Sequence, residues 1–132
     1  MANNMCNYLV KKLLDHALGV AAYTMPTTIY VGLFTADPTK TGAAATEITG
    51  NAYARKAMAF NAATLGAGNT ANTADVVWPQ ATGAWGTISH VVLFDALSGG
   101  NPLFYGPLSA PQVVANTNTF QIKSGQSSVA MS

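Results

Sequence analysis

The spacing of hydrophobic residues changes once along the chain, close to Pro26. Before that proline, apolar side chains recur every three or four residues, which is the period of one face of an amphipathic helix. The side chains in this stripe are Cys6, Leu9, Leu13, Ala17 and Val20. The pattern predicts a helix over residues 5–20, with Asn3 or Asn4 as its N-cap. Gly19 lies near its end, and Pro26 prevents any continuation.

Leu9 and Leu13 form the middle of this stripe. A surface helix buries its apolar face against other protein, so we expect both leucines to be buried. The covering protein is either the rest of the same chain or a neighbouring chain, and the pattern is compatible with both. Leu9 and Leu13 are therefore the two interface residues that the sequence predicts.

After Pro26 the hydrophobic period becomes two, which is the period of a β-strand. Short segments of this kind alternate with turn-rich segments that contain Gly, Pro and Asn. Strands are expected within residues 27–36, 52–60, 74–80, 86–96, 102–108, 119–125 and 126–132, and loops over residues 38–51 and 61–72. No helical pattern separates the strands, which argues against a parallel α/β sheet.

One helix followed by about seven short strands is typical of an all-β fold. The class that fits best is an antiparallel β-sandwich, Ig-like or jelly-roll-like, with one N-terminal α-helix. We expect a single domain over residues 1–132, with the helix within residues 1–22 and the sandwich over residues 27–132.

Glycine and proline residues predict where one strand ends and how the last two strands pair. Proline lacks the N–H that a central strand needs, so Gly106-Pro107 is expected to end the strand that begins near Pro102. Gly125 offers a turn, and the segments on its two sides are expected to pair with each other as the last two strands.

The segment from Trp85 to Gly106 contains the residue types of a hydrolytic site, namely Ser89, His90 and Asp95. Side chains alternate between the two faces of a strand, so Ser89 and His90 are expected to point apart and not to hydrogen-bond as nucleophile and base. Asp95 lies roughly 20 Å from Ser89 along an extended strand. We therefore expect no catalytic residues and a protein that is not an enzyme.

The chain offers no set of metal or cofactor ligands. Its one cysteine, Cys6, lies in the apolar stripe and is expected to be a small buried side chain. His16 and His90 are far apart in the sequence, and the carboxylates are scattered. Gly99-Gly100 is not followed by the Lys and Ser or Thr of a phosphate-binding loop. We expect no metal and no cofactor.

Charged residues are scarce. Asp, Glu, Lys and Arg make up 8% of the chain, against about 25% in a typical soluble domain. Hydrophobic residues make up 49%, the formal net charge is +1 and the mean hydropathy is +0.23. A surface with so little charge is weakly solvated and tends to associate. We expect a homo-oligomer in which much of the surface contacts other protein chains.

The same scarcity argues against nucleic acid and membrane partners. Six Lys and Arg against five Asp and Glu form no basic field for phosphates. The basic doublets Lys11-Lys12 and Arg55-Lys56 are expected to be solvated surface. Lys11, Lys12 and Asp15 also interrupt the first apolar segment, so we expect neither a transmembrane helix nor a secretory signal there.

Aromatic residues raise an alternative, a carbohydrate-binding module. Tryptophan and tyrosine rings can stack on sugars when they are exposed, and they also fill the cores of sandwiches. The sequence alone is compatible with both uses. The residues concerned are Tyr53, Trp78, Trp85, Phe94, Phe104 and Tyr105.

Four segments in a fixed order resemble a family of small tailed-phage proteins. They are LFTADP at residues 33–38, GNAYAR at residues 50–55, NTADVVWP at residues 72–79 and WGTISHVVLFDALSGG at residues 85–100. Their order and spacing carry the resemblance, and a preceding helix is usual in the family. The polar end of the chain, NTNTFQIKSGQSSVAMS, departs from the family's apolar closing strands.

Members of this family are usually described as tail-fibre or minor structural proteins. The resemblance implies a non-enzymatic virion component that assembles with further copies and with other virion proteins, after synthesis in the cytoplasm of a bacterial host. A capsid decoration or cement protein is the alternative within this class, because the resemblance is compatible with the head as well as the tail. A receptor module that binds a host-surface glycan is the second alternative.

Overall fold

The computed structural model describes residues 4–42 and 46–130 of the 132-residue chain. The described part contains nine β-strands and one α-helix, and its strand pairings are antiparallel. The helix is α1 (Asn7–Ala17), and the strands are β1 (Asn4–Met5), β2 (Tyr30–Phe34), β3 (Lys56–Ala57), β4 (Asn69–Ala71), β5 (Val76–Val77), β6 (Gly86–Phe94), β7 (Pro102–Val114), β8 (Gln121–Ile122) and β9 (Ser128–Ala130). The all-β fold with one N-terminal helix is confirmed, with nine strands in place of about seven.

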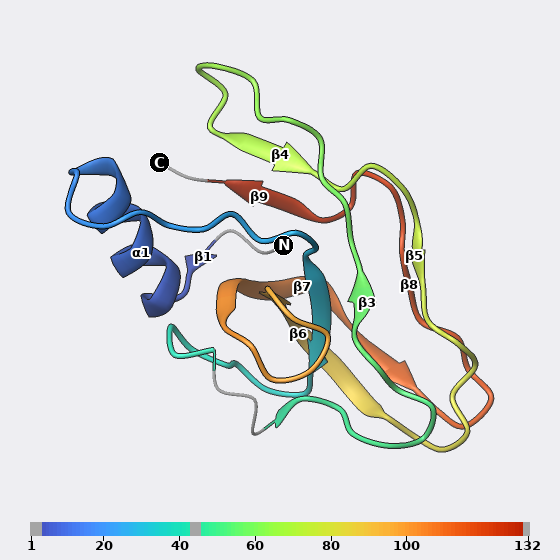
Figure 1. The fold of residues 1–132 in the computed structure, drawn as a ribbon. Helices are drawn as coiled ribbons and strands as arrows, with labels where there is room; N and C mark the ends of the chain where they lie inside the picture. Colours follow the sequence, from blue (N-terminus) through green and yellow to red (C-terminus); the bar gives the residue numbers. More distant parts are fainter. Residues whose placement is uncertain (1–3, 43–45, 131–132) are drawn as a thin grey trace.

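Five strands form one sheet in the order β1-β7-β6-β2-β3 (Figure 1). The longest strands, β6 and β7, lie at its centre, and β2 pairs with the other side of β6. Two smaller ladders, β4–β9 and β5–β8, bring segments from distant parts of the sequence side by side. Figure 1 shows α1 at the opposite end of the molecule from the β5–β8 ladder.

The core covers both faces of β2 and β6. One face carries a large cluster that includes Val31, Leu33, Val91 and Leu93. The other face carries a smaller cluster of Phe34, Val92 and Phe94. Strands that are buried on both faces need apolar residues at nearly every position, which explains why YVGLF and VVLF contain no charged residue.

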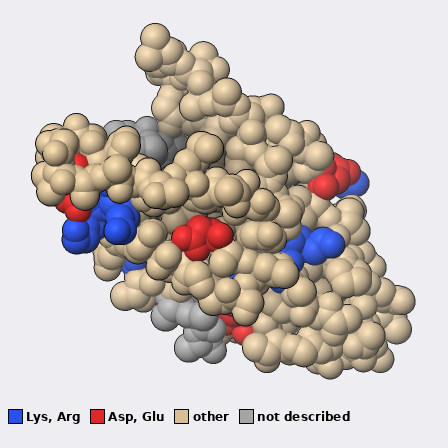
Figure 2. All heavy atoms as spheres, in the orientation of Figure 1, with Lys and Arg blue, Asp and Glu red and all other residues tan. Residues whose placement is uncertain are grey.

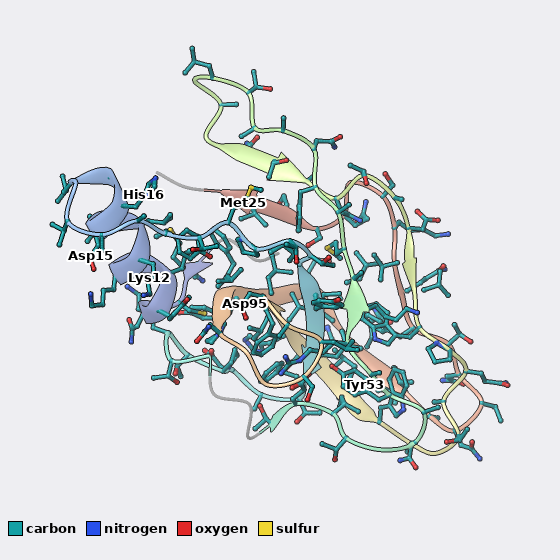
Figure 3. The ribbon with its side chains drawn as sticks, in the orientation of Figure 1. Lys12, Asp15, His16, Met25, Tyr53 and Asp95 are labelled. Carbon is teal, nitrogen blue, oxygen red and sulfur yellow. The ribbon has the colours of Figure 1, made fainter. Side chains whose placement is uncertain are left out.

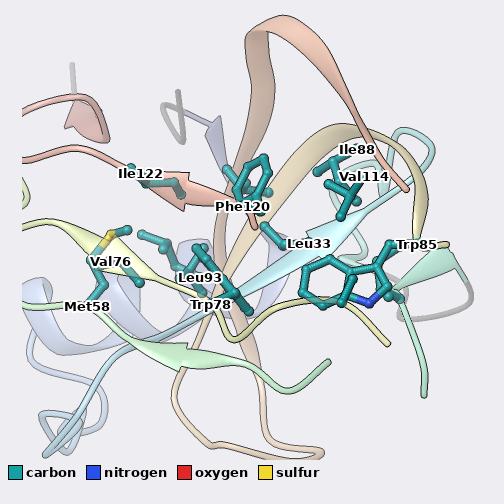
Figure 4. Packing of buried hydrophobic residues seen from close by; sticks show 14 of the residues in the cluster. Leu33, Met58, Val76, Trp78, Trp85, Ile88, Leu93, Val114, Phe120 and Ile122 are labelled. Atoms are coloured by element: carbon teal, nitrogen blue, oxygen red, sulfur yellow. The ribbon is translucent and has the colours of Figure 1, made fainter. Parts of the chain in front are cut away.

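A second layer of side chains completes the large cluster (Figure 4). It comes from the segments in and around the β5–β8 ladder, and it includes Val76, Trp78, Phe120 and Ile122. The rings of Trp78 and Phe120 meet edge to face, with centroids 5.3 Å apart, which is a favourable geometry for aromatic pairs. The sheet and this second layer together enclose the core of the sandwich.

The helix is shorter at both ends than the predicted span of residues 5–20. Asn4 lies in β1 and does not cap the helix, and Asn3 lies outside the described residues. Cys6 occupies the N-cap position without a side-chain cap hydrogen bond. The helix ends at Ala17, and Gly19 adopts a φ of +77°, a left-handed conformation that favours glycine after a helix. Pairing of β1 with β7 therefore replaces the expected first turn.

Strand β7 continues through Gly106 and Pro107, where a break was predicted. Pro107 pairs with His90, and the register then shifts so that Gln112 pairs with Ile88. More residues of β7 than of β6 lie between these two pairs, so the extra ones bulge out of the ladder. The predicted break is wrong because pairing with β6 resumes beyond the irregularity.

The last two strands pair with earlier strands and not with each other, so the predicted terminal pair is wrong. Strand β8 pairs with β5, and β9 pairs with β4. Strand β4 itself lies within residues 61–72, which the sequence predicts as a loop. Residues 131–132, the end of the expected last strand, lie outside the described part of the chain.

A buried asparagine explains this arrangement of the chain end. The Asn72 side chain is 1% exposed, and its amide nitrogen donates to the carbonyl of Lys123 at 3.1 Å. Its carbonyl oxygen accepts from the N–H of Ser127 at 3.0 Å. Because a buried amide needs such partners, Asn72 fixes the C-terminal segment to the start of the β5–β8 region.

Candidate functional site

Exposed apolar side chains follow one another at the C-terminal end of α1. Leu14, Leu18, Val20 and Met25 are exposed by 55%, 75%, 74% and 79%, and every residue over 16–22 is exposed. We call these four side chains the α1-end surface. In Figure 3, Lys12, Asp15 and His16 mark α1 at one end of the molecule, and Met25 lies on the segment that leads from α1 towards β2. Large apolar side chains that are exposed close together in the sequence make this segment a candidate contact surface.

Other large exposed apolar residues in the described part of the chain are isolated from one another in the sequence. They are Leu65, Val77, Leu97 and Val113. Single exposed apolar side chains are normal on a protein surface and carry no functional meaning by themselves. The four residues of the α1-end surface differ from these because they lie within twelve consecutive positions of the chain.

Hydrogen bonds hold the α1-end surface in a defined conformation. The N–H groups of Val20 and Ala21 both donate to the carbonyl of Asp15, at 2.8 and 3.1 Å. The N–H of Tyr23 donates to Nδ1 of His16 at 3.0 Å. The backbone after Gly19 is therefore folded back onto the last turn of the helix.

The charged side chains of α1 are paired within the helix. Lys11 forms an ion pair with Asp15, one helical turn away, and the Lys12 ammonium lies 5.7 Å from the centre of the Tyr8 ring. Figure 3 shows Lys12 and Asp15 on α1. On the face shown in Figure 2, charged residues form small separate patches and most of the surface is uncharged. Lys11 and Asp15 neutralise each other, whereas Lys12 keeps its positive charge over the Tyr8 ring.

The first half of α1 is anchored on the sheet. Leu9 is 4% exposed and Cys6 is fully buried, and the N–H of Cys6 donates to the carbonyl of Leu103 in β7 at 2.9 Å. Burial raises the pKa of the Cys6 thiol to about 11, so this cysteine is an inert apolar group at neutral pH. Leu13 is half-buried. Leu9 is thus covered by its own chain, and contact of either leucine with another chain stays a prediction.

A buried ion pair lies elsewhere, within the segment that joins β2 to β3. Nε and Nη2 of Arg55 donate to the two carboxylate oxygens of Glu47, both at 2.8 Å. The Tyr53 hydroxyl also donates to Glu47, at 2.8 Å, and accepts from the N–H of Leu33 at 2.9 Å. Burial raises the pKa of the Tyr53 hydroxyl. We call Glu47, Tyr53 and Arg55 the buried polar cluster.

Arg55 also fastens the turn after β6. Its Nη1 donates to the carbonyls of Ala96 and Gly99 at 3.0 and 2.8 Å, and its guanidinium lies 3.5 Å from the centre of the Phe94 ring. Arg55 is 7% exposed, so its predicted place on the solvated surface is wrong. Every nitrogen of the guanidinium bonds within the protein, so Arg55 ties the buried polar cluster to the turn after β6.

Gly32 in β2 makes room for the buried polar cluster. A Cβ atom at this position would lie 2.8 Å from a carboxylate oxygen of Glu47 and 3.1 Å from the Phe94 ring. Any side chain there would displace the ion pair from the sheet. The glycine within the apolar run YVGLF is therefore explained by the close approach of Glu47. The sequence alone does not indicate this role, because it does not show that Glu47 lies next to Gly32.

Ser89 and His90 form a hydrogen bond, which corrects the prediction that they point apart. Ser89 Oγ lies 2.8 Å from Nδ1 of His90. The register shift next to Ser89 interrupts the alternation of faces, as a β-bulge does. Ile88 consequently shares the large cluster with Val91, although regular alternation would place them on opposite faces. The bulge therefore brings together two side chains that a regular strand separates.

This serine–histidine contact lacks the other parts of a catalytic site in the described chain. The Asp95 carboxylate accepts two hydrogen bonds from Asn101, at 2.7 and 3.0 Å, and closes the turn after β6. No acidic side chain among the described residues is hydrogen-bonded to His90 to orient its ring. A triad needs such an orienting group.

The aromatic residues considered for sugar stacking are largely in the core. Trp78, Trp85 and Phe94 are 1%, 5% and 2% exposed, and both indole N–H groups donate to backbone carbonyls. Tyr53 belongs to the buried polar cluster and meets Trp85 edge to face at 5.5 Å. Their ring faces are used inside the protein, so these four residues do not form an exposed stacking platform.

No group of three or more His, Cys, Asp and Glu side chains in residues 4–42 and 46–130 is placed to hold a metal ion. Within the same ranges, no helix has the length and apolar character to cross a membrane.

Comparison with known proteins identifies the family. A family model described as "Podophage GP4 fiber I protein gp80" matches residues 4–130, which include all the strands and the helix described above. A search of curated proteins found no match. The predicted resemblance to tailed-phage structural proteins is confirmed by this match over nearly the whole chain. The chain belongs to the podophage GP4 fiber I protein gp80 family, a family of phage tail-fibre structural proteins.

Proposed function

We propose that the protein is a non-enzymatic subunit of a phage tail fibre, or a minor tail component, that acts through assembly with itself and with other virion proteins. The family match over residues 4–130 is the observation that carries this proposal. The protein is made in the cytoplasm of the bacterial host and then becomes part of the virion.

Composition and surface support an assembly role. Charged residues make up 8% of the chain, and the buried polar cluster takes two of them out of the surface. The α1-end surface exposes four large apolar side chains in one segment. Contacts between subunits would cover such side chains and remove them from water. Leu13, half-buried beside Leu14, is proposed to take part in the same contact.

Purified virions provide the test of location. Quantitative mass spectrometry counts the copies per particle, and immunogold labelling with an antibody to this chain shows where they lie. We expect label on the tail and a copy number that is a small multiple set by tail symmetry. Label over the head with hundreds of copies would instead support the capsid decoration alternative. Absence from the particle would overturn the proposal.

A glycan screen tests the receptor alternative. A subunit that acts only in assembly is expected to bind no sugar specifically, because Trp78 and Trp85 are buried. Purified protein is applied to an array of bacterial surface glycans, with a known lectin as the positive control. Specific binding that survives the change of Phe104 and Tyr105 to alanine would require a sugar site elsewhere on the chain.

A further inference from the structure

The sandwich is open along one line, between β7 and β8. Strands β7, β6, β2 and β3 are joined in that order by backbone pairing, β3 contacts β5, and β5 pairs with β8. These strands therefore form a series around the large core cluster (Figure 1). Within the described residues, the two ends of the series, β7 and β8, do not pair with each other.

A groove lies at this opening, and we call it the β7–β8 groove. It is lined by residues of β7 between Leu108 and Gln112 and by the segment 119–123 in and around β8. Phe120 and Ile122 belong to the large core cluster, whereas the residues that alternate with them are exposed. The groove therefore has an apolar floor and a polar rim, which suits a chain whose side chains alternate between two faces.

Strand β8 presents unpaired backbone groups to this groove. The N–H of Trp78 donates to the carbonyl of Phe120 at 3.0 Å, and Val77 lies opposite Gln121 in the next pair of the ladder. Hydrogen-bonded and non-hydrogen-bonded pairs alternate in an antiparallel ladder, so the N–H and C=O of Gln121 point away from β5. Gln121 lines the groove, and no described strand pairs with this edge of β8.

Strand β7 supplies the facing edge. It pairs with β1 at Phe104 and Tyr105, and beyond Tyr105 this edge has no partner strand in the described part of the chain. Pro107 and Pro111 lack an N–H, as is common on edge strands. Over residues 106–113, β7 therefore offers more acceptors than donors, and Gln121 offers one of each.

The two facing edges limit what fits between them. A strand in the groove needs both of its own edges free, because one faces β7 and the other faces β8. Each described strand of this chain already pairs along at least one edge. The described strands of a second copy are therefore unsuitable, and the geometry favours an extended segment of a different protein.

Charge narrows the choice further. Lys123 is the one charged side chain among the described residues that line the groove, and its ammonium lies 3.5 Å from the carboxylate of Asp75. A charged side chain placed between β7 and β8 would lose its hydration without gaining a free counter-ion. The complementary segment is therefore uncharged.

We propose that the β7–β8 groove binds an extended, uncharged segment of a different virion protein, which adds as a strand between β7 and β8. The proposal rests on the proposed function as an assembling virion subunit, and it adds a contact separate from the α1-end surface. In strand addition, backbone hydrogen bonds supply affinity, and alternate side chains supply specificity.

Photo-cross-linking in purified virions tests the partner. Benzoylphenylalanine in place of Gln121 should link, on irradiation, to one segment of another virion protein, which mass spectrometry identifies. The matched control carries the same group in place of Val77, which lies opposite Gln121 in the ladder and faces away from the groove; it should not link to that segment. Links from position 121 only to a second copy of this chain, or no links in virions that contain the chain, would overturn the proposal.

Peptide binding tests the backbone pairing. The probe is a synthetic peptide with the sequence of the cross-linked segment, and calorimetry measures its binding to the full chain. Gln121→Pro removes the N–H that faces the groove and should weaken binding about tenfold, the loss expected for one hydrogen bond. Val77→Pro removes an N–H from the opposite edge of the same ladder and should leave binding unchanged. Circular dichroism checks that both variants fold.

Methylation of the peptide's backbone nitrogens tests the pairing without any change to the protein. A strand between two edges donates its N–H groups to one neighbour or the other, so N-methylation of the central peptide residues should weaken binding at least tenfold. A methylated peptide that binds as tightly as the unmodified one would overturn strand addition.

The virion samples keep this proposal separate from the proposed function. Virions that contain the chain on the tail but give no link from position 121 would refute the groove contact and leave the tail role standing. A specific link from position 121 in particles that carry the chain on the head would refute the tail role and leave the groove contact standing. Absence of the chain from virions would refute both.

Discussion

The buried polar cluster and the α1-end surface reverse the usual distribution of charged and apolar groups. Arg55 and Glu47 are removed from water and joined by two hydrogen bonds, while Leu18, Val20 and Met25 remain in contact with water. In most proteins charged residues cover the surface and large apolar residues are covered. The comparison shows that this chain uses scarce charge to fix its own loops and leaves an apolar surface exposed to water.

The two regions therefore carry different properties. The buried polar cluster joins the segment before β3 to the turn after β6, and its loss should affect folding. The α1-end surface contributes little to the fold, and its loss should affect association. Variants that separate stability from association can confirm or break this division.

Arg55→Ala is expected to have the largest effect on stability, because it leaves the Glu47 carboxylate buried without its counter-ion. Removal of one partner of a buried ion pair costs about 3–5 kcal/mol. Urea unfolding followed by tryptophan fluorescence measures the change. Lys123→Ala is the control, because Lys123 and Asp75 form a 3.5 Å pair between solvent-exposed side chains and its loss should leave stability nearly unchanged. Equal losses from both variants would show that burial does not distinguish the pairs.

Leu9→Ala sharpens the comparison within α1 itself. Leu9 is 4% exposed, so its truncation leaves a cavity and should lower the free energy of unfolding by about 2–5 kcal/mol. Leu18→Ala removes the same atoms from a side chain that is 75% exposed and should leave the monomer's stability nearly unchanged. The two variants are compared by urea unfolding at a concentration where the chain is monomeric. A large loss with Leu18→Ala would mean that the end of α1 stabilises the fold.

Alkaline pH tests the anchored half of α1. The pKa of the Cys6 thiol is raised from 9.0 to about 11 in the folded chain, so the unfolded chain loses this proton first as pH rises. The stabilisation is complete below pH 9 and is lost as pH rises through about 11. It amounts to about 2–3 kcal/mol. Unfolding of wild type and Cys6→Ala across this range measures it, and the variant should lack this part of the decline. Identical declines would contradict the burial of a protonated thiol.

Ser89→Ala is expected to have the smallest effect. The change removes one hydrogen bond to His90 and should alter the free energy of unfolding by at most about 1 kcal/mol. No hydrolytic activity should be lost in assays with ester, peptide and glycoside substrates. A reproducible activity of the wild-type chain that disappears in this variant would give the bulge a catalytic role.

The sequence is sufficient for the parts of the fold whose periodicity is strong. Strands β2 and β6 are long apolar runs, and both are predicted near their observed bounds. Strands β5, β8 and β9 lie within segments that were predicted as strands, whereas β4 lies in a predicted loop. These four strands contain two or three residues each, which is too few for the sequence to indicate how they pair. Their partners are fixed by contacts such as those of Asn72, and these contacts join residues about fifty positions apart.

The candidate site is predicted only in part for a similar reason. The apolar stripe of the first helix is visible in the sequence. The sequence does not show how far the rest of the protein covers this stripe, so it gives no reason to expect that Leu9 is buried and Val20 exposed. Arg55 looks like surface because the groups that bury it, Glu47 and the turn at Ala96, are brought to it by the fold. Ser89 and His90 are separated by regular alternation and joined by a bulge that only the β7 register reveals.

Hydrogen–deuterium exchange of residues 14–25 tests most directly the claim that the end of α1 is a contact surface in the assembled particle. Exchange is measured by mass spectrometry on purified virions and on the isolated chain diluted until it is monomeric. Slower exchange of this segment in virions than in the monomer is the result that we predict, with the amides of β6 protected equally in both samples. Equal exchange of residues 14–25 in the two samples would contradict the claim.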